Sequence, residues 1–175
     1  MNIALFYGST TCYTEMSAEK IAAQLTTLGH QVAVHDIKDT PLSELEQHQV
    51  LILGISTWDF GELQEDWESH WDDLDHIDLQ GKIVALFGLG DQIGYTEWFQ
   101  DALGMLHDKV VVQGGTVIGY WPNQGYQFEK SLALSDDKQY FYGLALDDES
   151  QYELSEQRIT TWCAQIHQEL LDIFS

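Results

Sequence analysis

Two continuous apolar runs constrain the fold of this 175-residue chain more than any other feature. The runs VLILGI (50–55) and KIVALFGLG (82–90) show no alternation of polar and apolar residues. A strand buried on one face alternates, whereas a strand covered on both faces is apolar almost throughout. The two runs therefore predict central strands of a parallel sheet with helices on both faces.

Segments with helical periodicity separate these runs from further strand candidates. The pattern predicts strands at 3–7, 32–37, 50–55, 82–90 and 110–119, with 140–146 as a continuation or partner of the last one. It predicts helices at about 14–28, 62–74, 95–107 and 155–173, with Gly29 ending the first and Ser155 capping the last. The alternation indicates β-α-β crossovers in one domain, residues 1–175, and the stretch 120–139 is expected to be a surface excursion.

Charge excludes several classes of partner. Twenty-nine acidic residues oppose seven basic ones, for a formal net charge of −22. Nucleic acids and anionic membranes are therefore poor partners. Nine of the acids lie within 59–78, where they form either an ordinary solvated surface or a docking face for basic proteins. Apolar runs shorter than about 18 residues and an N-terminus without a basic leader region predict a cytoplasmic protein.

Three segments follow predicted strands and carry unusual chemistry. They are 8–14 (GSTTCYT), 56–62 (STWDFGE) and 88–95 (GLGDQIGY). Ligands of open α/β sheets bind beyond the carboxyl ends of the strands, so these three loops are expected to meet at one edge. No C-x-x-C or Cys/His metal spacing accompanies Cys12 or Cys163, and no metal site is expected.

The first of these loops is rich in hydroxyl groups and has no cation. Backbone N–H groups at a helix N-terminus attract anions, and nearby hydroxyls add further donors. The loop therefore suits a phosphate, although Ser and Thr are also common helix caps. Trp58 and Tyr95 on the other two loops could enclose a flat ring, or they could be ordinary core and rim aromatics.

Together these stretches resemble one known family. FYGSTTCYTE (6–15), LILGISTWDFGELQEDW (51–67), VALFGLGDQIGYTEWFQDALGML (84–106) and GYWPNQGYQF (119–128) are similar to the corresponding stretches of flavodoxins of the long-chain group, and most of all to the second-flavodoxin subtype. The resemblance implies the flavodoxin topology itself, a five-stranded parallel sheet of order 2-1-3-4-5. It also implies that the long-chain insertion splits the last strand.

The resemblance assigns residues to a bound FMN. It places the FMN phosphate on the first loop. One face of the flavin ring would lie against Trp58 and the other against Tyr95, and Asp147 would lie near the ribityl chain. The implied cofactor-binding residues are Ser9, Thr10, Thr11, Cys12, Tyr13, Thr14, Ser56, Thr57, Trp58, Asp59, Phe60, Gly61, Gly88, Leu89, Gly90, Asp91, Gln92, Tyr95 and Asp147. Relatives usually carry glycine at position 12, and cysteine is small enough to replace it if its φ stays negative.

The implied function is that of a low-potential, one-electron carrier. A basic NADPH-dependent flavodoxin or ferredoxin reductase is the expected donor, docking near Glu62, Glu65 and Asp66, and acceptor redox enzymes are the expected recipients. The protein is expected to be monomeric. Two alternatives stay open: an FMN-dependent NAD(P)H:quinone oxidoreductase, and a flavin-free receiver domain, which would need an aspartate where Ser56 and Thr57 stand.

Overall fold

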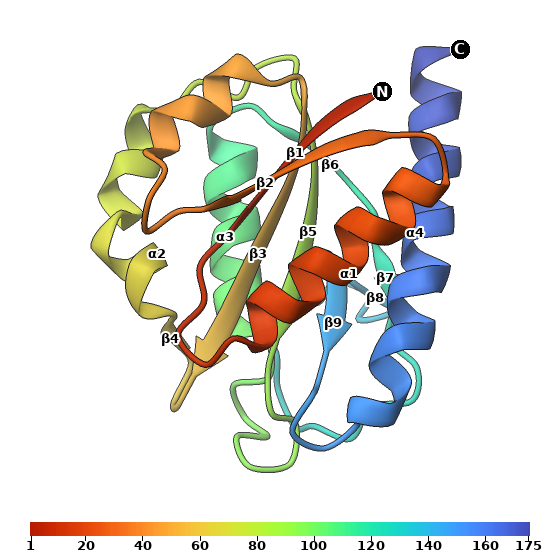
Figure 1. Cartoon of the computed structure of the whole chain (residues 1–175). Coiled ribbons are helices and arrows are strands. Elements are labelled where there is room, and N and C mark those ends of the chain that lie inside the picture. The colour runs from red at the N-terminus through yellow and green to blue at the C-terminus, as the bar shows by residue number, and fades with distance from the viewer.

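A central parallel sheet organises the chain. The computed structural model describes residues 1–175, and Figure 1 shows the sheet between two layers of helices. The main strands follow the order β2-β1-β3-β5-β6. Their bounds are β1 Asn2–Tyr7, β2 Gln31–Asp36, β3 Val50–Trp58, β5 Ile83–Leu89 and β6 Thr116–Ile118. The predicted order 2-1-3-4-5 is therefore confirmed.

The last strand position is shared by two short strands. β6 pairs with the first half of β5 (Val84 opposite Val117), whereas β9, Leu144–Leu146, pairs with its second half (Gly88 opposite Ala145). Between them the chain leaves the sheet and forms a small antiparallel pair, β7 (Trp121–Pro122) with β8 (Tyr140–Phe141). The predicted insertion that splits the last strand is thus confirmed.

Helices cover both faces of the sheet. In Figure 1, α1 and α4 lie together in front of the sheet, and α3 lies on the other side. The helices are α1 Tyr13–Thr27, α2 Glu65–Ser69, α3 Asp101–Val112 and α4 Tyr152–Phe174; the 3-10 turns are η1 Leu42–Gln47 and η2 Trp71–His76. Every residue from Val50 to Ile55 is buried, as the continuous apolar run predicts. No helix has both the length and the apolar character that crossing a bilayer requires.

Three predicted element boundaries were wrong. The helix predicted at 95–107 begins only at Asp101, because Gln100 adopts a left-handed φ of 64° that helical backbone does not allow. The valines at 110–112 end this helix instead of starting a strand, and Gly114 (φ 94°) terminates it. The last helix starts at Tyr152, so Ser155 lies inside its first turn and is not its cap.

The acidic segment after β3 also differs from the predicted helix at 62–74. Residues Glu62–Leu63 form a short strand, β4, which turns back antiparallel onto the end of β3. The helix α2 then lasts only five residues and is followed by η2. The buried side chain of Gln64 fixes the start of α2, because its oxygen accepts a hydrogen bond from the Trp67 N–H.

Candidate functional site

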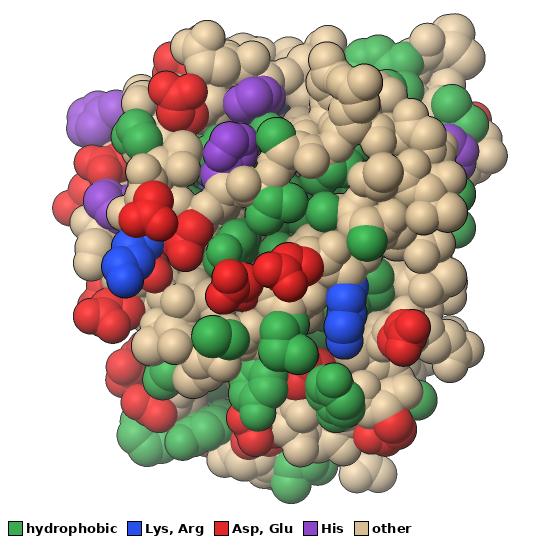
Figure 2. Space-filling model, viewed as in Figure 1, with side chains coloured by type: hydrophobic (Ala, Val, Ile, Leu, Met, Phe, Trp, Pro, Cys, Tyr) green, Lys and Arg blue, Asp and Glu red, His purple; other side chains and the backbone are tan.

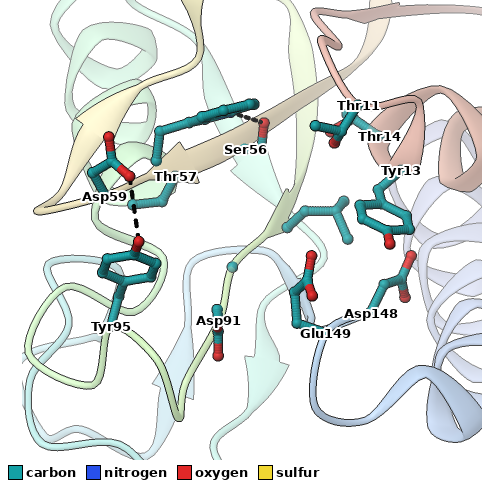
Figure 3. A pocket seen from close by; sticks show the side chains of 13 residues that line it. Thr11, Tyr13, Thr14, Ser56, Thr57, Asp59, Asp91, Tyr95, Asp148 and Glu149 are labelled. Atoms are coloured by element: carbon teal, nitrogen blue, oxygen red, sulfur yellow. Dashed lines mark hydrogen bonds between the residues drawn. The ribbon is translucent and has the colours of Figure 1, made fainter.

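The site is a cavity of about 360 Å³ beyond the carboxyl ends of the strands (Figure 3). The loops after β1, β3 and β5 all contribute to it, as the sheet-edge rule predicts. Eleven of the predicted residues line the cavity: Thr11, Tyr13, Thr14, Ser56, Thr57, Trp58, Asp59, Leu89, Gly90, Asp91 and Tyr95. The remaining lining residues are Asp148 and Glu149, and no lysine or arginine is among them.

Backbone donors dominate the end of the cavity formed by the loop after β1. None of the N–H groups of residues 9–14 donates a hydrogen bond within the protein. The Ser9 hydroxyl accepts from the N–H of Glu15 at 3.4 Å and so holds the loop against the first turn of α1. Six consecutive free donors precede or begin a 15-residue helix, and Thr11 and Thr14 lie at the cavity wall; this arrangement suits an anion.

Cys12 adopts a left-handed backbone conformation that turns this loop, and this conformation costs conformational free energy. Its φ is 69°, so the condition of a negative φ, under which cysteine would replace glycine easily, is not met. A left-handed conformation costs a side-chain-bearing residue about 1–2 kcal/mol, which explains why glycine suits this position. The Cys12 side chain is exposed and does not line the cavity.

Trp58 and Tyr95, contributed by the segments at the ends of β3 and β5, also line the cavity, and each has a polar anchor. The Trp58 indole N–H donates to the Ser56 hydroxyl at 3.1 Å. The Tyr95 hydroxyl donates to the Asp59 carboxylate at 3.4 Å across the mouth of the cavity (Figure 3). The Asp59 charge is the main cause of the raised pKa of Tyr95. Both rings are therefore held in place before any ligand arrives.

The turn that carries Asp59 depends on its neighbours. Asp59 itself has a φ of 43°, a left-handed value that Asp tolerates better than most residues. Gly61 has a φ of 86°, and a Cβ there would lie 3.0 Å from both Trp98 and the Asp101 carboxylate. Phe60 stays at the rim, 66% exposed, with its ring edge-to-face against Tyr95 and Trp98. These contacts place Phe60 and Gly61 beside the cavity and not in its wall.

The other predicted residues outside the cavity wall shape it from behind. The Thr10 hydroxyl accepts a hydrogen bond from the buried Gln64 side chain, which ties the first loop to α2. A Cβ on Gly88 would meet the buried Gln100 side chain, whose amide is held by two hydrogen bonds, so the close packing favours glycine there. Gln92 is buried and donates from both its N–H and its side-chain amide to Asp147. Ser9 and Cys12 complete the group of eight predicted residues that do not line the cavity.

Asp147 is fully buried, and its carboxylate holds two loops together. One carboxylate oxygen accepts from the N–H groups of Glu149 and Ser150, at 3.1 and 2.9 Å. The other accepts the two hydrogen bonds from Gln92, at 3.1 and 2.8 Å. Asp147 thereby joins the loop after β5 to the segment before α4, and it directs its two successors toward the cavity.

Those successors, Asp148 and Glu149, were missed in the sequence. They follow β9, and the same sheet-edge rule that selected the other three loops would have found them. Burial raises the pKa of Asp148, an effect that the hydrogen bond from the Ser155 hydroxyl and the charge of Lys20 oppose. Glu149 is exposed, and its side chain has no hydrogen bond within the protein.

A second hollow of about 170 Å³ adjoins the first and shares Trp58 and Asp59 with it. Its remaining lining is Thr10, Glu62, Leu63, Glu65 and Glu68. The predicted docking residues Glu62 and Glu65 therefore lie beside the aromatic end of the cavity. Figure 2 shows acidic side chains over much of the visible face and few basic ones.

Known proteins share both the sequence and the architecture. The Flavodoxin family model matches residues 5–162. Flavodoxin 2 of Salmonella typhi and that of Escherichia coli are each 56% identical to this chain over 176 residues, covering 100% of both chains. A flavodoxin of Nostoc is 46% identical over 167 residues, covering 95% of this chain and 96% of its own.

Solved structures agree with the sequence relatives. The crystal structure of Fusobacterium nucleatum flavodoxin bound to flavin mononucleotide superposes with a TM-score of 0.89 at 33% identity, covering 96% of this chain and 98% of that one. Flavodoxins are electron-transfer proteins and not enzymes, which sets aside the quinone oxidoreductase and the receiver domain. With its whole length matched by the curated relatives and its loops converging as described, this chain belongs to the flavodoxin family.

Proposed function

We propose that the cavity binds FMN non-covalently and that the protein is a low-potential, one-electron carrier. The observation that carries the proposal is the row of free N–H groups at residues 9–14, in a loop whose Thr11, Tyr13 and Thr14 line a cavity that Trp58 and Tyr95 also line. The Fusobacterium relative holds flavin mononucleotide in a fold of the same design, which supports the proposal.

The residues present fit this cofactor. Amide and hydroxyl donors can hold a phosphate without a cation, as helix N-termini commonly do. The cavity volume of about 360 Å³ falls within the usual range for small-molecule sites, roughly 300–1,000 Å³. Trp58 and Tyr95, anchored by Ser56 and Asp59, offer aromatic faces to a flat ring, a contact that contributes about 0.5–1.5 kcal/mol beyond area burial.

The acidic side chains around the cavity are expected to lower the reduction potential of a bound flavin. FMN supplies reversible transfer of single electrons when bound. Four carboxylates line the cavity, from Asp59, Asp91, Asp148 and Glu149, and no basic side chain offsets them there. One carboxylate about 12 Å from an added negative charge raises its energy by about 1.4 kcal/mol at an effective dielectric constant of about 20. This equals about 59 mV per electron, so the site favours a strongly reducing carrier.

The same charges suit a basic partner. Glu62, Glu65 and Asp66 lie on β4 and α2, beside the hollow next to Trp58. A positively charged NADPH-dependent reductase would be steered toward this surface, and acceptor redox enzymes would use it in turn. We further propose that the protein is a cytoplasmic monomer and that its 175 residues form one domain.

Anaerobic reduction of the purified protein tests the function. The protein is loaded with FMN, desalted, and titrated with a strong reductant while its absorption is recorded. We expect retained flavin absorbance, reduction at a potential well below that of free FMN, and electron transfer to an added acceptor protein. A protein that stays colourless after desalting, or one that oxidises NADPH by itself in steady state, would contradict the proposal.

A further inference from the structure

The segment between β9 and α4 brings two carboxylates to the anion-binding end of the cavity. Asp148 and Glu149 share the cavity wall with Thr11, Tyr13 and Thr14. Figure 3 shows Tyr13 with its hydroxyl on the same side of the cavity as the two carboxylates. Acidic side chains beside a row of N–H donors are unexpected, because they repel the anion that the donors attract.

The placement of this pair is fixed by the fold. Asp147 holds the turn through hydrogen bonds from the N–H groups of Glu149 and Ser150. The Asp148 carboxylate accepts from the Ser155 hydroxyl at the start of α4. Lys20, whose charge acts on Asp148, does not line the cavity, and its ammonium group lies over the Tyr152 ring at 5.4 Å. The cavity wall itself therefore holds the two carboxylates and no cation.

Resting on the proposed FMN function, we propose that Asp148 and Glu149 determine how strongly the site prefers FMN to riboflavin. The two flavins share the ring and the ribityl chain, and only FMN carries the phosphate. The free N–H groups of residues 9–14 favour the phosphate, and the two carboxylates oppose it. Their balance sets the ratio of the two affinities, while the ring contacts contribute equally to both.

The sign of the salt dependence follows from this balance. A phosphate site built from lysine or arginine weakens as salt increases, because ions screen the attraction. Here the only full charges in the cavity wall are negative, so screening removes repulsion. FMN affinity is expected to rise with salt, and riboflavin affinity is expected to stay constant.

The test is a fluorescence titration of the FMN-free protein with FMN and, separately, with riboflavin. The variants are Glu149→Gln, the double variant Asp148→Asn/Glu149→Gln, and a matched double variant, Glu129→Gln/Asp136→Asn, which removes two exposed acids of the insertion that do not line the cavity. Titrations are run at about 10 mM and about 300 mM salt, which brackets strong and weak screening.

At low salt we expect the FMN-to-riboflavin preference to rise about threefold in Glu149→Gln and about tenfold in the double variant, as removal of like charges near the phosphate requires. The matched double variant should retain the wild-type ratio. The salt effect on FMN should shrink in the double variant.

Two results would overturn the inference. One is a change of equal size for FMN and riboflavin; the other is the same ratio shift in the matched double variant. The Glu149→Gln variant keeps the test decisive if Asp148→Asn disturbs folding, since the Glu149 side chain is exposed and unpaired. Failure of the proposed function looks different, because wild-type protein would then bind neither flavin.

Discussion

The two ends of the cavity hold a ligand by different means. At the end formed by residues 9–14, the donors are backbone N–H groups, and the side chains around them vary in size and type. At the opposite end, the contact surface consists of the side chains of Trp58 and Tyr95, each anchored by a hydrogen bond. A backbone site tolerates a residue such as Cys12 where relatives usually carry glycine, whereas a side-chain site depends on the side chain that forms it.

Truncating an aromatic side chain should produce the largest loss of affinity, and the loss should be equal for FMN and riboflavin. Tyr95→Ala removes a ring from the wall, and burial of such a ring contributes about 2–3 kcal/mol. We expect FMN and riboflavin affinities to fall together, by about 30- to 150-fold in calorimetric titration. Tyr95→Phe, which keeps the ring and loses only the bond to Asp59, should stay close to wild type. A Tyr95→Ala variant within twofold of wild type would contradict a ring-stacking role.

Removing the Thr11 hydroxyl, on the loop after β1, should have a smaller effect and should lower the affinity for FMN only. Thr11→Ala removes one donor from the cavity wall and leaves the N–H groups in place. A hydrogen bond to a charged group contributes about 1.5–3 kcal/mol when buried and less when exposed, and Thr11 is exposed. We expect about fivefold weaker FMN binding with riboflavin as the internal control. An equal loss for both flavins would place Thr11 at the ring or ribityl chain and break the comparison.

The shape of the backbone site can be tested without any ligand. Cys12→Gly removes the strain of a left-handed cysteine and adds some chain entropy to the unfolded state. We expect a net stabilisation of about 0.5–1 kcal/mol in urea unfolding of the FMN-free protein. Cys12→Ala should give no such gain, because alanine keeps the Cβ. Equal gains for both variants would show that the thiol, and not the conformation, causes the cost.

The smallest predicted effect concerns the support of the aromatic end. Asp101 is 6% exposed, accepts from the Leu132 N–H at 2.8 Å, and lies against Gly61. Burial raises its pKa above the ordinary value of 3.8, despite that hydrogen bond. The folded state therefore holds this proton more tightly, so the contribution of Asp101 to stability falls as pH rises from about 4 through the raised pKa.

Asp101→Asn is the corresponding variant, since it keeps an acceptor for Leu132 and cannot ionise. We expect it to increase the free energy of unfolding relative to wild type at pH 7 and to differ less from wild type near pH 4. Urea unfolding at the two pH values measures this. A gain that is larger at pH 4 than at pH 7 would contradict the burial argument.

Sequence patterns predicted the parts of the fold that burial dictates. The strands at 50–55 and 82–90 agree with the structure because both of their faces are covered, which leaves a continuous apolar run. The start of α3 was wrong for a tertiary reason. Gln100 is left-handed, and its buried amide donates to the carbonyls of Gly88 on β5 and Leu146 on β9. Local periodicity carries no signal for such a contact.

The candidate site was predictable to the extent that loops could be assigned to strand ends. The loops at 8–14, 56–62 and 88–95 were found because each follows a clear apolar run. Asp148 and Glu149 were missed although the predicted segment 140–146 ends at Leu146, as β9 does. That segment was predicted only as a continuation or a partner of another strand, so its end was not assigned to the edge where the other loops meet. The φ of Cys12 was not predicted, although the glycine that relatives usually carry at this position indicates a left-handed turn.

Backbone amide NMR of the FMN-free protein, titrated with FMN and with riboflavin, tests the central claim most directly. We predict that FMN shifts the amide signals of residues 9–14 and protects them from exchange, whereas riboflavin moves only signals of the 57–61 and 88–95 loops. Unchanged signals at 9–14 with saturating FMN, or identical shifts there with riboflavin, would contradict a phosphate held by the backbone of this loop.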